Sequence, residues 1–114
     1  MTLREVAGAL KCEALTDSID WGLEMEAVVA SDGMSEILAF SSSGALMLTG
    51  LTNIQSVRTA VVADVRAIVY VRGKRPNERV IELAAEKAIP VLVTSLGMFD
   101  SCGILYRLGL KGAM

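Results

Sequence analysis

The sequence contains no histidine, only two cysteines and two prolines, and few aromatic residues, which make up 4% of the chain. Without histidine, the common Cys/His zinc sites lack ligands, and serine or cysteine triads lack their usual base. Neither a GxxxxGK[ST] phosphate loop nor a GxGxxG dinucleotide motif is present. We therefore expect no catalytic residues, no metal site and no bound cofactor, and we do not expect an enzyme.

Long apolar segments and a strong net charge are also missing. No uninterrupted apolar run approaches the roughly 18 residues that suggest a membrane span, and Arg4 and Glu5 stand where a secretory signal needs an apolar core. The net charge of −2 argues against general nucleic-acid binding. Cys12 and Cys102 lie far apart in the sequence and form no CxxC pair. Two free thiols in a reducing compartment are the default interpretation. We expect a cytoplasmic protein with no membrane or nucleic-acid partner.

The chain is instead rich in aliphatic residues, and 53% of it is hydrophobic. Compact runs rich in valine, isoleucine and leucine are typical of parallel strands that are buried on both faces. The apolar runs predict strands over 11–15, 27–30, 45–49, 67–71 and 91–94. The helical spacing of apolar residues between these runs predicts helices over 2–10, 34–40 and 98–108, and two more that begin at Asn53 and Asn77.

From residue 45 onward, the predicted strands and helices alternate. Such strand–helix–strand connections are right-handed and produce a parallel sheet with helices packed over it. A chain of 114 residues is long enough to bury one core without disulfides. The predicted fold is thus α/β, a three-layer sandwich with a mainly parallel sheet, formed by a single domain over residues 1–114.

Polar residues follow the predicted strands at the points where these strands end. In open α/β sheets, ligands bind beyond the carboxyl ends of the strands, and the free N–H groups of the helix N-termini that follow favour anions. The positive charges of Arg72, Lys74 and Arg75 lie in one of these loops. The candidate ligand-binding residues are Ser31, Asp32, Thr49, Gly50, Asn53, Arg72, Lys74, Thr94 and Ser95.

Each of these loops also has a simpler interpretation. Ser, Thr, Asp and Asn before a helix most often cap it, so Ser31 or Asp32 would cap helix 34–40 and Asn53 the next helix. A cluster of positive charge in a turn is more often a solvated loop than a binding site. The sequence does not decide between phosphate binding and these structural roles.

The segment GKRPNERVIELAAEKAIPVLVTSL resembles the end of the DRTGG domain and of the related N-terminal domain of HPr kinase/phosphorylase. The opening MTLREVAGALKCEAL and the stretch VVASDGMSEILA are similar to the corresponding parts of that family. The residues that match the family pattern in the first segment are Gly73, Pro76, Ala85, Glu86, Ile89, Pro90, Leu92 and Thr94.

The resemblance implies a small α/β regulatory module with the HPr kinase N-terminal-domain fold. The acid–arginine pair that gives the family its name falls near Gly50-Leu51-Thr52, where neither charge is present. A ligand contact that this pair makes in other members of the family is therefore not expected in this chain. No counterpart of the kinase domain follows within these residues, so phosphotransfer is not expected.

Two functions from different classes remain. The first is a non-catalytic regulatory module that senses a nucleotide or other phosphorylated metabolite as a homodimer. The second is an oligomerisation or partner-docking module, with another protein as its partner and no small ligand. The homodimer is expected because small domains of this family tend to pair and symmetric dimers are the commonest assembly.

Overall fold

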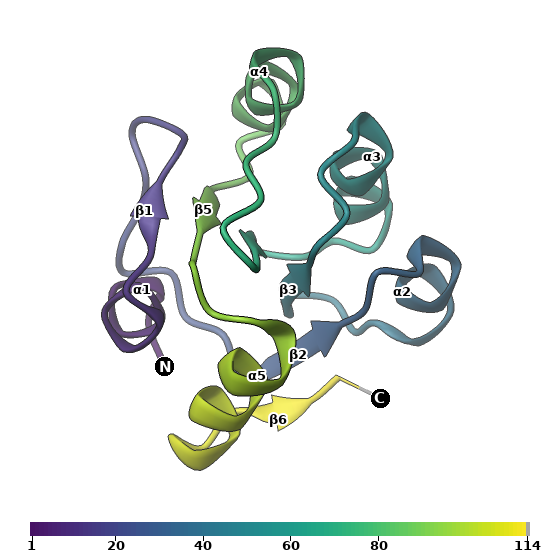
Figure 1. The fold of residues 1–114 in the computed structure, drawn as a ribbon. Coiled ribbons are helices and arrows are strands. Elements are labelled where there is room, and N and C mark those ends of the chain that lie inside the picture. The colour runs from purple at the N-terminus through teal and green to yellow at the C-terminus, as the bar shows by residue number, and fades with distance from the viewer. Residues whose placement is uncertain (114) are drawn as a thin grey trace.

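The computed structural model describes residues 1–113, which form one six-stranded sheet with helices on both faces (Figure 1). The strands are β1 (Glu13–Ala14), β2 (Ala27–Ala30), β3 (Leu46–Thr49), β4 (Ala67–Tyr70), β5 (Val91–Val93) and β6 (Lys111–Gly112). The helices are α1 (Leu3–Leu10), α2 (Met34–Phe40), α3 (Ile54–Val62), α4 (Glu78–Glu86) and α5 (Met98–Arg107).

The strand order in the sheet is β1-β5-β4-β3-β2-β6. All neighbouring strands run parallel except β1, which pairs antiparallel with β5 at one edge. Strands β2 to β5 are consecutive neighbours, joined in turn by α2, α3 and α4. Because these four strands are parallel, their carboxyl ends and the loops that follow them lie at the same edge of the sheet.

The helices form two layers, one on each face of the sheet. Helices α2, α3 and α4 lie side by side on one face, while α1 and α5 contact each other on the other (Figure 1). Since side chains alternate across a strand, Ile68 and Tyr70 of β4 pack toward α2–α4, and Ala67 and Val69 pack toward α1 and α5. The predicted three-layer α/β sandwich with a mainly parallel sheet is confirmed.

Capping residues begin two of the helices as the sequence predicts. Thr2 and Glu5 form a reciprocal capping box at α1, in which each side chain accepts a hydrogen bond from the other residue's backbone N–H. Asn77 caps α4 by accepting from the N–H of Val80. Strand β6 was not predicted, because its two residues carry no strand pattern and are held only by pairing with β2.

No helix within residues 1–113 has the length and apolar character needed to cross a membrane.

Candidate functional site

The four loops that follow β2, β3, β4 and β5 meet at one edge of the sheet and are called here the loop rim (residues 31–33, 49–53, 72–75 and 94–96). Backbone hydrogen bonds join neighbouring loops. The N–H of Arg72 donates to the carbonyl of Leu96 at 2.7 Å, and that of Gly73 donates to the carbonyl of Thr94 at 2.8 Å. The predicted site residues are therefore brought together, and their role in binding stays a prediction.

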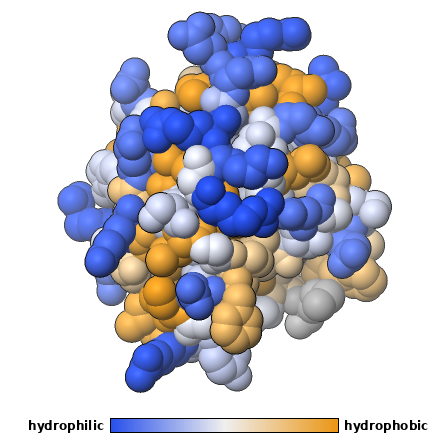
Figure 2. Space-filling view, in the orientation of Figure 1, coloured by the Kyte–Doolittle hydropathy of each residue, from blue (hydrophilic) through white to orange (hydrophobic). Residues whose placement is uncertain are grey.

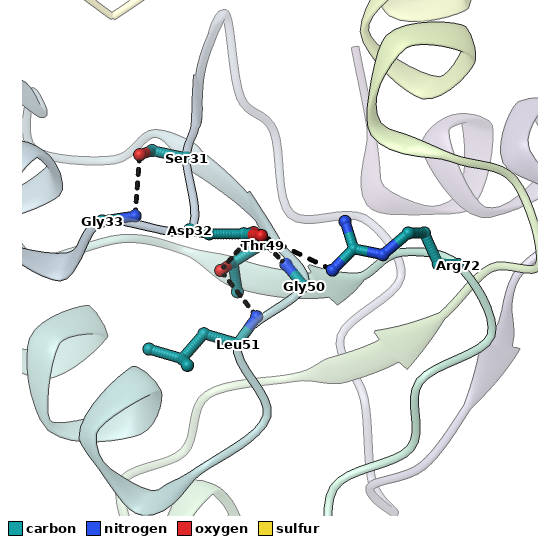
Figure 3. A network of polar contacts seen from close by, with 7 residues as sticks. All are labelled: Ser31, Asp32, Gly33, Thr49, Gly50, Leu51 and Arg72. Atoms are coloured by element: carbon teal, nitrogen blue, oxygen red, sulfur yellow. Dashed lines mark hydrogen bonds and ion pairs between the residues drawn. The ribbon is translucent and has the colours of Figure 1, made fainter.

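Asp32 is the centre of the polar contacts in the loop rim (Figure 3). Its Oδ1 accepts a hydrogen bond from the backbone N–H of Gly50 at 2.7 Å and lies 3.5 Å from the hydroxyl of Thr49. Its Oδ2 forms an ion pair with Nη2 of Arg72 at 3.4 Å. The three donors come from the ends of β3 and β4 and converge on one carboxylate, so this part of the loop rim can hold a negative charge.

Gly50 allows the guanidinium of Arg72 to lie directly over the end of β3. A Cβ atom at position 50 would stand 2.0 Å from Nη2 of Arg72, which is closer than any real contact. A larger residue at position 50 would displace Arg72 from Asp32. The sequence marks Gly50 only as the end of a strand, and its contact with a residue 22 positions away has no signal in the local pattern.

Arg72 and Gly73 both adopt left-handed backbone conformations, with φ of 62° and 66°. They form a tight turn that is closed by a hydrogen bond from the N–H of Lys74 to the carbonyl of Val71 at 3.2 Å. The left-handed conformation costs a non-glycine residue about 1–2 kcal/mol. The hydrogen bonds from Arg72 and Gly73 to the loop after β5 offset this cost and hold the Arg72 side chain in the loop rim.

Two of the three positive side chains in this turn have acidic partners. Besides the pair of Arg72 with Asp32, Arg75 makes two contacts with Glu13 of β1, at 2.7 and 3.1 Å. These contacts lower the pKa of the exposed Glu13 carboxyl. Within residues 1–113, Lys74 takes part in no ion pair and is exposed. Lys74 is thus the positive group of the loop rim that a solute can approach without breaking a salt bridge.

Three strand-end hydroxyl groups share one local structure. Each accepts a hydrogen bond from the backbone N–H two residues later, which is a common way for Ser and Thr to form turns. The pairs are Ser31 with Gly33 at 2.9 Å, Thr49 with Leu51 at 3.1 Å and Thr94 with Leu96 at 3.2 Å. These hydroxyls therefore shape the loops, whether or not they also contact a ligand.

The remaining predicted site residues, Asn53 and Ser95, are exposed on the loop rim. The capping predictions for α2 and α3 were wrong in detail. Helix α2 begins after Gly33, and neither Ser31 nor Asp32 caps it, because Asp32 turns toward Gly50 instead. Asn53 does occupy the N-cap position of α3, but its side chain makes no capping hydrogen bond.

Several hollows lie away from the loop rim and were not anticipated, among them two that border α3 and α5. One, of about 560 Å³, lies between α3 and α4 and is bordered by charged residues, including Arg58 and Glu86. The other, of about 390 Å³, is apolar and lies beside α5. The spacing of Phe99, Cys102 and Tyr106 in the sequence is a signal for the second hollow, since it places these residues on one face of a helix.

Potential metal ligands do not gather in the part of the chain that the structure describes. Cys12 and Cys102 are free thiols, and both are partly buried. Burial raises the pKa of the Cys12 thiol to about 11 and also raises the pKa of Cys102. Both thiols are thus mainly protonated at neutral pH, which is unfavourable for a nucleophile.

We expect Cys12 to react slowly with alkylating reagents in the folded protein. With a pKa of about 11 rather than 9.0, its thiolate fraction at pH 8 falls roughly 100-fold. Alkylation by iodoacetamide, followed at the Cys12 peptide by mass spectrometry, would measure the rate before and after unfolding in urea. Equal rates in the two states would contradict the buried position of Cys12.

Comparisons with known proteins place this architecture in a family. The family model described as the DRTGG domain matches residues 5–108. No curated protein matches the chain. A similar solved structure contains the CBS and DRTGG domains of the regulatory region of Clostridium perfringens pyrophosphatase, in complex with its activator diadenosine tetraphosphate.

The likeness to that structure has a TM-score of 0.76 at 20% sequence identity. It covers 91% of this chain and 45% of the other, so this chain spans less than half the length of the clostridial region. At this identity the likeness confirms the fold. Because the family model covers nearly the whole chain, the resemblance seen in the sequence is confirmed, and the protein belongs to the DRTGG domain family.

Proposed function

We propose that residues 1–114 form a single, non-catalytic regulatory domain that binds a nucleotide or other phosphorylated metabolite on the loop rim. The observation that carries the proposal is the convergence of the Gly50 N–H, the Thr49 hydroxyl and the Arg72 guanidinium on the carboxylate of Asp32. These groups are hydrogen-bond donors of the kind that phosphate oxygens accept. A ligand phosphate would have to displace the Asp32 carboxylate from these donors. It would also recruit Lys74, which takes part in no ion pair within residues 1–113.

The helices that start at the loop rim support the same proposal. Neither α3 nor α5 has a side-chain cap, because the Asn53 side chain makes no capping bond and position 97 is glycine. Their first N–H groups are therefore available, and the helix dipole favours negative charge there. Lys74 and these N-termini add positive charge to the loop rim, next to the carboxylates of Asp32 and of Asp100 in the first turn of α5.

The likeness to the clostridial pyrophosphatase supports a regulatory role at the level of the fold. That relative uses the same fold in a regulatory region that also contains CBS domains and is complexed with a dinucleotide activator. By analogy, this domain would report the level of a phosphorylated compound to a partner rather than transform it. Two free cysteines fit a cytoplasmic location, and we propose a homodimer as the working form.

A ligand screen by thermal unfolding tests the proposal. Diadenosine tetraphosphate, adenine nucleotides and inorganic pyrophosphate would be added to the purified protein. A ligand at a hundredfold excess over its dissociation constant should stabilise the fold by about 2.7 kcal/mol, which raises Tm by roughly 10 °C for a domain of this size. Absence of a shift with every compound would overturn the proposed ligand class.

Substitution of two exposed lysines, one on the loop rim and one away from it, tests where the ligand binds. Replacing Lys74 with alanine should weaken binding about tenfold, because one charge-assisted contact to phosphate is lost. Lys87 follows the last turn of α4, at the opposite end of that helix from the loop rim, and is also exposed. Lys87→Ala should leave affinity unchanged. Equal losses in both variants would mean that binding follows net charge and not the loop rim.

A docking or oligomerisation module without a small ligand is the second candidate. The observation that favours it is the apolar surface of α5, where Phe99 and Tyr106 are largely exposed. An exposed apolar cluster of this kind marks a site of association. The two functions separate in the screen, since a pure docking module would show no thermal shift with phosphorylated compounds and still self-associate or bind a protein.

A further inference from the structure

The outer face of α5 carries two large side chains, Phe99 and Tyr106, that its own chain leaves largely uncovered. Phe99, Cys102, Gly103 and Tyr106 follow the i, i+3, i+4, i+7 spacing of one helical face and are called here the α5 stripe. Phe99 is 88% exposed and Tyr106 is 77% exposed. Leu105, by contrast, is buried against the sheet. Helix α5 thus carries large apolar side chains both toward its own core and toward solvent.

The α5 stripe borders the apolar hollow of about 390 Å³ between α5 and the edge of the sheet. The opposite wall comes from β2, β6 and the residue before β6, and includes Val28, Ala30 and Leu110. In Figure 1, α5 and β6 lie together at the lower end of the molecule, and Figure 2 shows apolar side chains among the hydrophilic ones over that end. The stripe and the hollow form one continuous surface.

We propose that this surface binds the same surface of a second copy of the chain, with the two α5 helices antiparallel across a twofold axis. The inference rests on the homodimer in the proposed function and adds the interface. A twofold contact requires a patch that complements itself. In an antiparallel pair centred on Gly103, Phe99 of one subunit meets Tyr106 of the partner subunit, and two aromatic contacts form.

Gly103 is the residue that permits close approach of the two helices. A Cβ atom added at position 103 would meet no atom within 4 Å, so the fold of the single chain does not require glycine there. Glycine inside a helix costs roughly 1 kcal/mol relative to alanine. In the antiparallel pair, the missing side chain lets the two helix backbones come together, as small residues do at other helix–helix contacts.

The charges beside the α5 stripe indicate that a second copy of the chain, and not another protein, covers this surface. Asp100 in the first turn of α5 and Arg107 in the last turn lie seven residues apart, and therefore flank the α5 stripe on the same side. Both are exposed, and neither takes part in an ion pair within residues 1–113. The antiparallel twofold axis brings Asp100 of each subunit next to Arg107 of the partner subunit, which gives two ion pairs.

A matched pair of glycine substitutions tests the interface. Gly103 and Gly8 are both exposed helical glycines around which an added Cβ meets open space, and Gly8 lies in α1 outside the α5 stripe. We expect the wild-type protein to sediment as a dimer. Gly103→Arg should weaken the dimer at least about tenfold by holding the helices apart, whereas Gly8→Arg should leave it unchanged. Circular dichroism would verify that both variants fold.

A charge-reversal cycle tests the antiparallel orientation. Asp100→Arg and Arg107→Asp should each weaken the dimer about threefold to tenfold, because each creates like-charge contacts across the interface. The double variant restores opposite charges and should recover most of the lost affinity. Two single variants that behave like wild type, or a double variant with no recovery, would overturn the antiparallel α5 pair.

The results separate this inference from the proposed function. A dimer that persists in Gly103→Arg would overturn the α5 interface and leave the homodimer standing. A wild-type protein that sediments as a monomer at every concentration would overturn both the interface and the homodimer, while the ligand screen would still decide the loop rim. A dimer that is lost in Gly103→Arg and kept in Gly8→Arg supports the inference.

Discussion

Replacing Leu48 with alanine is expected to lower the free energy of unfolding by about 2–5 kcal/mol, the range for large-to-small changes in a packed core. Leu48 lies on β3, which has neighbours on both sides, and its side chain is 0% exposed among the residues that face α1 and α5. The substitution removes apolar contact area and leaves a cavity that the surrounding sheet cannot close. Urea denaturation followed by circular dichroism would measure the change.

Leu38 provides the control for this prediction. It lies on α2 with 47% of its surface exposed, so Leu38→Ala should cost less than about 1 kcal/mol. The two variants remove the same atoms, and their main difference is burial, since the helix and strand preferences of alanine span only about 1 kcal/mol. Similar losses of stability would mean that β3 is not in the centre of the core.

Thr94→Val is expected to destabilise the protein by about 2–4 kcal/mol, although the two side chains have nearly the same shape. The Thr94 side chain is 1% exposed, and its hydroxyl donates to the carbonyl of Leu10 at 2.6 Å and accepts from the N–H of Leu96. Leu10 ends α1, and its carbonyl belongs to the last turn, which has no partner within the helix. Valine would leave both backbone groups without their partner, at about 1–3 kcal/mol for each buried group.

The matched control is Thr52→Val. Thr52 lies in the loop after β3, and its hydroxyl makes no hydrogen bond among the described residues. Its replacement should change the free energy of unfolding by less than about 0.5 kcal/mol. If Thr94→Val instead abolished ligand binding at unchanged stability, Thr94 would be a ligand contact, and the structural role described above would be wrong.

The sheet could be predicted from the sequence because its signals are local. The runs 27–30 and 67–70 are nearly continuous aliphatic strands, and the structure places β2 and β4 there. The cap at Asn77 likewise depends on neighbouring residues alone. Strand β6 could not be predicted, since its two residues are held by pairing with β2 and not by their own pattern.

The position of the loop rim could be predicted from the sequence, but the side-chain contacts within it could not. Strand polarity places the loops at one edge, whereas the partner of each side chain depends on distant segments. Asp32 turns to Gly50 and Arg72, and Thr94 reaches Leu10, 84 residues away in sequence. Tertiary contacts therefore decided between capping and other roles for these residues.

Amide chemical shifts of the labelled protein, recorded while a phosphorylated ligand is titrated, test the proposed function most directly. The account predicts the largest changes at the backbone N–H groups of Gly50, Leu51 and Gly73, with smaller ones at the start of α3 and α5. Shift changes that are confined to the hollow between α3 and α4 would contradict binding on the loop rim. The absence of shift changes with every phosphorylated compound tested would contradict it as well.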